Sequence, residues 1–250
     1  MRRGAAILAA LVVLAGCGGS DGSNERPQLI VSAASSLRNA LTDYGDQFRP
    51  AVVRLSFGGS DELAAQIRAG GRADVFAAAN TKLPAALFAE GKTEKPVEFT
   101  ANRLVLAVPK DSHVNSLDDL AKPGVKLGIG SETVPIGSYT REVLSRLPSL
   151  ERNRILANVK TAEPDVAGIV GKLTQGAVDA GFVYATDVAA AGGSLRAVQL
   201  PPRLRPTVIY AGVVVKGTKH HEQAQAFLNG LVKGMGQAAL RKAGFLPLPR

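Results

Sequence analysis

The sequence predicts an α/β protein in which strands and helices alternate and the sheets are largely parallel. Short apolar segments alternate with longer segments whose apolar residues recur at helical spacing. Clusters of glycine, proline and serine separate the two kinds of segment. Such alternation is typical of sheets whose faces are covered by helices. With 250 residues, the chain is long enough for one large domain or two small ones.

The predicted elements follow one another along most of the chain. Strands are expected at residues 29–32, 52–56, 74–77, 104–108, 126–129, 181–183 and 207–215. Helices are expected at residues 36–48, 61–69, 82–89, 136–147, 165–175 and 222–243. Leu63 and Ile67 lie on one face of the second helix, which Gly70 and Gly71 end. Pro164 supports the predicted start of the fifth helix, because proline is favoured where a helix begins.

Two strand-like stretches, residues 104–110 and 206–214, are candidate crossing points between two lobes. If the chain crosses at both, one lobe consists of residues 28–106 and 208–250, and the other of residues 107–207. Two crossings make a hinge, and ligands often bind in the cleft between hinged lobes.

The N-terminus has the pattern of a bacterial export signal. Two arginines precede an apolar run at residues 5–14 that is too short to span a bilayer, and Leu-Ala-Gly-Cys at residues 14–17 resembles a lipobox. Cys17 is the only cysteine, so no internal disulfide is possible. We therefore expect a lipoprotein signal peptide at residues 1–16, a lipid on Cys17 and a flexible tether at residues 17–27. The lipid would hold the exported protein on the cell membrane, facing the periplasm or the cell exterior. The alternative is a plain secretory signal with an incidental cysteine.

The charge and motif content argue against nucleic-acid binding and catalysis. The formal net charge is +9, but the lysines and arginines are scattered and are not interleaved with aromatic residues. A solvated basic surface or an anionic ligand accounts better for this balance. The sequence has no G-x-S-x-G elbow between a strand and a helix, and no H-E-x-x-H or P-loop motif. In the sequence, the three histidines are not near the serines discussed next.

Two serines lie where an apolar strand passes through small residues into a helix. Ser36 follows residues 33–35 (Ala-Ala-Ser), and Ser60 follows residues 58–59 (Gly-Gly). Small residues let a ligand approach the free N–H groups of a helix start, and the helix dipole favours an anion there. Capping of the helix is the alternative role of each hydroxyl. Asp61 must point to solvent if Ser60 is to bind an anion.

Three further residues lie at comparable junctions in the middle of the chain. Pro135 has no N–H, so Ile136 offers the first free amide of the helix that begins there. Val166 has a similar place at the next helix start. Tyr184 ends an apolar strand, where a phenol faces the crevice of an open α/β sheet. An ordinary proline-started loop, capping by a nearby acidic residue and a core tyrosine are the respective alternatives.

In order and spacing, these motifs resemble the molybdate-binding proteins of bacterial ABC importers, a family of periplasmic binding proteins. The resemblance covers residues 29–248 and depends on the segments at residues 33–37, 57–67, 73–76, 134–139 and 179–187. It implies a type II periplasmic-binding-protein fold with two lobes. Each lobe is then a mainly parallel sheet flanked by helices, and the ligand cleft lies between the lobes.

The resemblance also implies the ligand and its contacts. The implied oxyanion-binding groups are the hydroxyls of Ser36 and Ser60, the amides of Ile136 and Val166, and the phenol of Tyr184, with Ser35 as the register alternative to Ser36. The family delivers molybdate, and also tungstate, to an ABC permease with its ATPase. We therefore expect a monomeric binding protein with no cofactor and no enzymatic activity. A binder of another tetrahedral oxyanion such as sulfate, and an exported serine hydrolase, are the alternatives.

Overall fold

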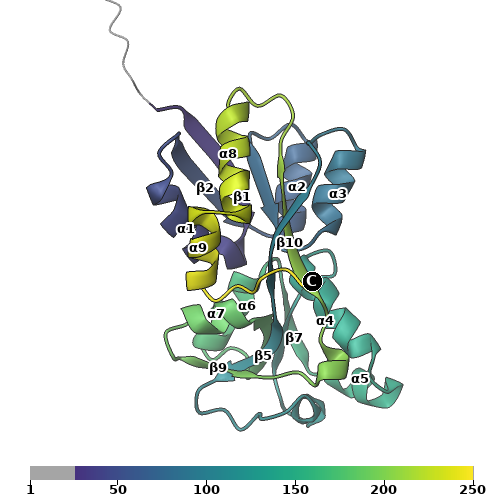
Figure 1. Ribbon diagram of the computed structural model, residues 1–250. Coiled ribbons are helices and arrows are strands. Elements are labelled where there is room, and N and C mark those ends of the chain that lie inside the picture. Colours follow the sequence, from purple (N-terminus) through teal and green to yellow (C-terminus); the bar gives the residue numbers. More distant parts are fainter. Residues whose placement is uncertain (1–25, 250) are drawn as a thin grey trace, which may run out of the picture.

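The computed structural model describes residues 26–249. The signal peptide expected at residues 1–16, Cys17 and most of the tether expected at residues 17–27 lie outside the described residues. Two five-stranded sheets, each covered by helices, form the upper and lower halves of the molecule in Figure 1. Within the described part of the chain, no helix is long and apolar enough to cross a membrane.

The first sheet has the strand order β2-β1-β3-β10-β4. Its strands are β1 (Gln28–Ala34), β2 (Val52–Gly58), β3 (Val75–Ala78), β4 (Val97–Asn102) and β10 (Val208–Val214). The elements packed around it are the 3₁₀ helix η1 (Ser35–Leu37) and the helices α1 (Arg38–Gln47), α2 (Ser60–Arg68), α3 (Lys82–Ala89), α8 (His221–Val232) and α9 (Met235–Lys242). Strand β1 pairs in parallel with β2 and β3, whereas β10 runs antiparallel to β3 and β4.

The second sheet has the order β7-β6-β8-β5-β9. Its strands are β5 (Leu104–Pro109), β6 (Leu127–Gly130), β7 (Val159–Glu163), β8 (Ala180–Tyr184) and β9 (Leu195–Val198). Its helices are α4 (Pro135–Ser145), α5 (Ser149–Ala157), α6 (Val166–Thr174) and α7 (Ala185–Ala190), with the short 3₁₀ helices η2 (Asp118–Ala121) and η3 (Pro202–Leu204). Strand β6 pairs in parallel with β7 and β8, whereas β5 runs antiparallel to β8 and β9.

The predicted α/β class is confirmed, but the sheets are mixed rather than mainly parallel. The reversed strands, β5 and β10, are those that the chain enters directly from the other sheet. Two parallel strands begin at the same end of a sheet, so a crossover connection, usually a helix, must return the chain to that end. A chain that arrives from the other sheet enters instead at the end where the two sheets meet, and its strand therefore runs in the opposite direction. The crossings lie between Asn102 and Leu104 and between β9 and β10.

Several predicted elements differ from the structure. The prediction misses the strands β4, β7 and β9 and the helices α5 and α7. Strand β7 alternates half-buried and exposed residues, and β9 is only four residues long, so neither gives a strong apolar signal. The single helix predicted at residues 222–243 is wrong. The chain forms α8 and α9 instead, because Gly234 has a φ of 111°, which interrupts the helix.

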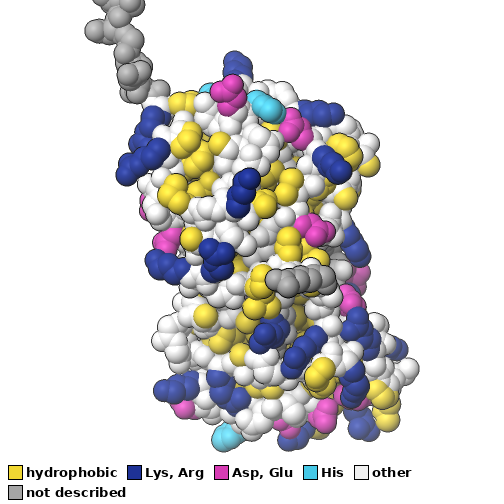
Figure 2. Space-filling view, viewed as in Figure 1, with side chains coloured by type: hydrophobic (Ala, Val, Ile, Leu, Met, Phe, Trp, Pro, Cys, Tyr) yellow, Lys and Arg dark blue, Asp and Glu magenta, His cyan; other side chains and the backbone are white. Residues whose placement is uncertain are grey.

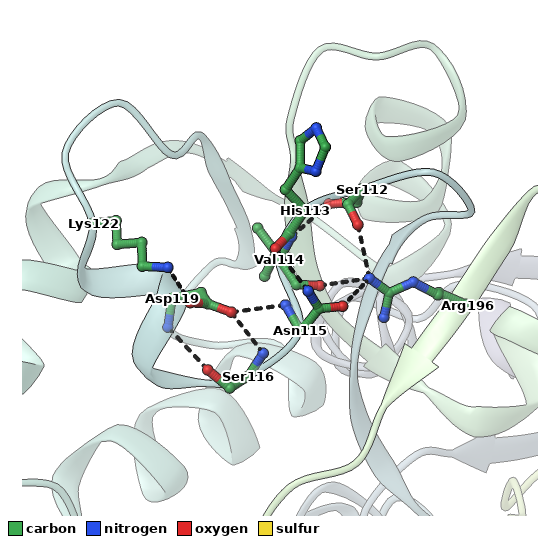
Figure 3. A network of polar contacts seen from close by, with 8 residues as sticks. All are labelled: Ser112, His113, Val114, Asn115, Ser116, Asp119, Lys122 and Arg196. Carbon is green, nitrogen blue, oxygen red and sulfur yellow. Dashed lines mark hydrogen bonds and ion pairs between the residues drawn. The ribbon is translucent and has the colours of Figure 1, made fainter.

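The loop between β5 and β6 is fixed by a network of polar contacts (Figure 3). Nη2 of Arg196 lies 2.9, 2.8 and 2.7 Å from the carbonyl oxygens of Ser112 and Val114 and from Asn115 Oδ1, and these three acceptors share its two hydrogens. Asp119 accepts the backbone N–H of Asn115 at 2.8 Å. The network therefore holds a long connection of the second sheet whose described residues form no α-helix or strand and only the short 3₁₀ helix η2. The imidazole of His113 points out of the network.

Candidate functional site

A small cavity lies between the two sheets, where β1, β2 and β8 end. All five residues assigned to the oxyanion line it: Ser36, Ser60, Ile136, Val166 and Tyr184. Its volume is about 20 Å³. One water molecule needs a cavity of roughly 10–15 Å³, and pockets for drug-sized molecules measure roughly 300–1,000 Å³. The size therefore suits a small ion rather than an organic solute.

Ser60 is the first residue of α2 and is 2 % exposed. Its hydroxyl does not cap the helix. Instead, Ser60 Oγ accepts the backbone N–H of Ala79 at 3.2 Å. A hydroxyl whose oxygen accepts from the protein keeps its proton for another acceptor. Ser60 is thus arranged to donate one hydrogen bond into the cavity.

Ser36 lies in η1, and no helix start there is capped by a side chain. Its Oγ is 2.9 Å from the phenol oxygen of Tyr210, on β10. The register alternative, Ser35, also lines the cavity and is buried. Tyr210 is a residue near the site that the sequence does not predict. A single tyrosine in an apolar strand carries no signal that it contacts a serine 174 positions away.

The two assigned amides lie in the first turns of α4 and α6. Ile136 follows Pro135, and Val166 is the first residue of its helix, so neither N–H has a carbonyl one turn earlier to bond. Asp165 caps α6 by accepting the N–H of Gly168 at 2.9 Å. Capping by an acidic residue, the alternative for this helix start, therefore does occur, and it leaves the amide of Val166 free.

Tyr184 ends β8 and is 1 % exposed. Among the described residues, its phenol oxygen has no hydrogen-bond partner. Burial raises the pKa of this phenol well above its usual value, so the group stays protonated at neutral pH. A buried hydroxyl without a partner costs about 1–3 kcal/mol. An acceptor in the cavity would remove that cost.

Asp61 is half-buried and turns towards the opposite side of the cleft, so it does not point freely into solvent as the anion hypothesis required. Its Oδ2 accepts the hydroxyl of Thr133, which precedes α4 on the opposite side of the cleft. Its Oδ1 is buried and has no partner among the described residues. The reason is the shape of the site, because α2 begins where the two halves of the molecule meet. Asp61 is nevertheless absent from the cavity lining.

The two halves of the molecule touch at Gly59. A Cβ atom built on Gly59 would lie 2.4 Å from the carbonyl oxygen of Pro164. The glycine has φ −62° and ψ 132°, which suit any residue, so its small size is what the site requires. Gly59 therefore permits a close approach of α2 to the start of α6.

No lysine, arginine or histidine of the described chain lines the cavity. The only described histidine in an ion pair, His221, contacts Glu94 at 2.7 Å. Neither Ser36 nor Ser60 is hydrogen-bonded to a histidine in the described part of the chain. The lysines and arginines are spread over the visible face of both halves (Figure 2). Among the described residues, Asp165 is the one charged residue that lines the cavity, and its Oδ1 accepts the N–H of Gly168. Apart from that helix cap, the described lining of the site offers neutral donors and lacks the histidine base that a serine nucleophile usually has.

Comparisons with known proteins identify the family and the fold. The family model for bacterial extracellular solute-binding proteins matches residues 29–246. The molybdate-binding protein ModA of Mycobacterium tuberculosis strain H37Rv is 31% identical over 224 residues, which cover 87% of this chain and 84% of that protein. A putative ABC transporter substrate-binding lipoprotein of Bacillus subtilis, YvgL, is 29% identical over 252 residues, covering 96% and 95%.

Solved structures show the same fold. The substrate-binding domain of a putative molybdenum ABC transporter from Clostridium difficile has a TM-score of 0.67 and 26% identity, covering 89% of this chain and 99% of that one. The periplasmic molybdate-binding protein of Azotobacter vinelandii has a TM-score of 0.77 and 24% identity, covering 89% and 100%. The sulfate-binding protein SubI of M. tuberculosis has a TM-score of 0.76 at 19% identity, covering 89% and 87%. The last two likenesses concern the fold alone.

Proposed function

The chain belongs to the family of bacterial extracellular solute-binding proteins that includes the ModA molybdate-binding proteins, and we propose that its cavity captures molybdate, and also tungstate, for an ABC transporter. The protein is a binding protein and not an enzyme. The observation that carries the proposal is that all five assigned groups are hydrogen-bond donors gathered around one small cavity. The proposed contacts are the hydroxyls of Ser36 and Ser60, the amides of Ile136 and Val166, and the phenol of Tyr184.

The chemistry of the anion suits this set of donors. Molybdate is a dianion at neutral pH and only accepts hydrogen bonds. Phosphate keeps a proton near neutral pH, and a cavity of donors leaves that proton unpaired at a cost of about 1–3 kcal/mol. Each hydrogen bond to a charged group contributes roughly 1.5–3 kcal/mol, so several neutral donors are enough without a lysine or arginine. The helix starts add their positive ends.

Sulfate has the same charge and shape as molybdate and is the second candidate, favoured by the likeness of the fold to SubI. Molybdate is the larger anion, so the spacing of the donors must discriminate between the two. We favour molybdate because the relatives with the higher identity are described as molybdate-binding proteins.

The proposed mechanism is closure of two lobes on the anion. The proposed lobes are the two halves that carry the two sheets, with the first boundary between Asn102 and Leu104 instead of after residue 106, because β5 belongs entirely to the second sheet. The two serines come from the first lobe, whereas the two amides and Tyr184 come from the second. An anion that bridges both sets binds the closed form more strongly than the open form and so shifts the population towards closure.

The protein acts outside the cytoplasm, as its family description states. We also propose that a lipid on Cys17 anchors it to the membrane and that the closed monomer delivers its anion to an ABC permease with its ATPase. The likeness to YvgL, which is described as a substrate-binding lipoprotein, supports the anchor.

Isothermal titration calorimetry with molybdate, tungstate, sulfate and phosphate, at equal ionic strength and pH 7, tests the function. We expect molybdate and tungstate to bind more tightly than sulfate, and phosphate to bind least. Tighter binding of sulfate would establish the second candidate. Equal binding of phosphate would refute a site made of donors.

A further inference from the structure

We propose that Tyr210 and Asn102 are positioning residues that fix the direction of the Ser36 hydroxyl, so that its proton points at the bound oxyanion. The inference rests on the proposed function of the cavity. Neither positioning residue lines the cavity itself. They act through a chain of hydrogen bonds that begins beside the first crossing between the sheets and ends at Ser36.

The chain begins at Asn102, the last residue of β4. Its Oδ1 accepts the backbone N–H of Arg103 at 2.8 Å. A backbone N–H can only donate, so this contact fixes which end of the Asn102 amide is oxygen. The Nδ2 donor therefore faces the Thr186 hydroxyl at 2.9 Å and the Tyr210 phenol at 3.5 Å.

The second step is at Tyr210. Because its oxygen accepts from Asn102, its own proton is directed to the remaining neighbour, Ser36 Oγ, at 2.9 Å. Burial raises the pKa of Tyr210 well above its usual value, so the phenol keeps that proton. The ring is fully buried and packs edge to face against Phe245 and Tyr184, with centroids 5.3 and 5.9 Å away. The phenol is thus held in one place.

The third step is at Ser36. An oxygen that accepts from Tyr210 leaves the serine proton for a different acceptor, and Ser36 lines the cavity. Ser60 obtains the same polarity from the backbone N–H of Ala79, which cannot be reversed. In the pair formed by Ser36 and Tyr210, either hydroxyl could donate to the other. The hydrogen bond from Asn102 to Tyr210 selects the direction in which Tyr210 donates and Ser36 accepts.

This arrangement bears on selectivity as well as affinity. A serine that only donates rejects an anion that carries a proton, whereas a serine free to rotate can accept from it. The relay therefore makes the site selective for fully deprotonated anions. Because Thr186 belongs to the second half and Tyr210 to the first, Asn102 also joins the two halves at the crossing.

The first test uses Tyr210→Phe, which removes the phenol oxygen and keeps the ring. We expect molybdate affinity to fall about tenfold, the value of one ordinary hydrogen bond. We also expect the ratio of molybdate to phosphate affinity, measured by competition titration, to fall. The matched control is Tyr44→Phe. Tyr44 is also buried and donates to the Phe227 carbonyl at 3.2 Å, so this variant should change neither the affinity nor the ratio.

The second test is a double-mutant cycle with Ser36→Ala. If Tyr210 acts through Ser36, Tyr210→Phe should weaken molybdate binding in the wild type and have no further effect in Ser36→Ala. Equal losses in the two backgrounds, or an unchanged molybdate-to-phosphate ratio, would overturn the inference. Circular dichroism confirms that each variant is folded.

Asn102→Asp serves if Tyr210→Phe does not fold. It keeps an acceptor for the Arg103 N–H but replaces the Nδ2 donor with an oxygen, so Tyr210 would turn its proton away from Ser36. The same fall in affinity and ratio is expected, and wild-type values would overturn the inference. If the wild-type protein binds none of the anions, the proposed function fails first, and the relay fails with it.

Discussion

Replacing Tyr184 by phenylalanine should stabilise the free protein against unfolding and weaken its binding of molybdate. The substitution removes one oxygen and keeps the ring, which packs against Tyr210 with centroids 5.9 Å apart. In the free protein, that oxygen is buried and has no partner among the described residues. With the anion bound, we propose that the same hydroxyl donates to a charged acceptor. The two effects therefore have opposite signs.

The magnitudes follow from the burial of the group. Removing an unpaired buried hydroxyl should raise the free energy of unfolding of the free protein by about 1–3 kcal/mol. For a domain of this size, each kcal/mol moves the unfolding midpoint by roughly 2–4 °C. Loss of a hydrogen bond to a charged acceptor should cost about 1.5–3 kcal/mol of binding, which is a factor of roughly 10–100 in Kd.

Thermal unfolding with and without molybdate, together with calorimetric titration, measures both effects. The control is Tyr44→Phe, which loses a satisfied hydrogen bond and should lower the midpoint without changing the affinity. A Tyr184→Phe protein that is less stable than the wild type and binds molybdate equally well would refute the assignment of this phenol to the ligand.

Three further predictions concern the same region. Ser60→Ala should weaken molybdate binding by about 1–3 kcal/mol while the protein stays folded, and calorimetry that finds an unchanged affinity removes Ser60 from the site. Gly59→Ala should lower the molybdate affinity at least about tenfold, the equivalent of one ordinary hydrogen bond, because the new Cβ would lie 2.4 Å from the Pro164 carbonyl oxygen and hinder closure. Small-angle scattering should then show no compaction when molybdate is added, and normal compaction would disprove the steric argument. Burial raises the pKa of the Asp187 carboxyl from 3.8 to about 7. The contribution of this group to stability is therefore complete below pH 3.8 and is lost as the pH rises through 7. Asp187→Asn should flatten the stability profile measured by urea unfolding from pH 4 to 8, and an unchanged slope would assign this pH dependence to another group.

The sequence predicts the parts of the fold and site that depend on neighbouring residues. The helix that begins at Ser60 and the helix that begins at Pro135 and contains Ile136 are each encoded in a few consecutive residues, and both begin within one residue of the predicted start. A main-chain donor needs only a helix start, so such positions can be predicted without knowing the partner.

Features that depend on distant residues could not be predicted in this way. The contact of Asp61 with Thr133 and that of Ser36 with Tyr210 require knowing how the two halves meet. The direction of β5 and β10 depends on which sheet the chain has just left, and apolar patterning is the same for either direction. The break at Gly234 depends on one backbone angle, and a lone glycine in a helical pattern is often tolerated.

The close approach of Gly59 to Pro164 also affects how long a bound anion stays in the cavity. Between these two backbones there is no room even for a Cβ atom, so an anion cannot leave the cavity by this route. If the two lobes close on the anion as proposed, dissociation has to wait until they separate, and the frequency of that separation sets the lifetime of the complex. A permease that holds the halves apart would shorten that lifetime without altering a single contact to the anion.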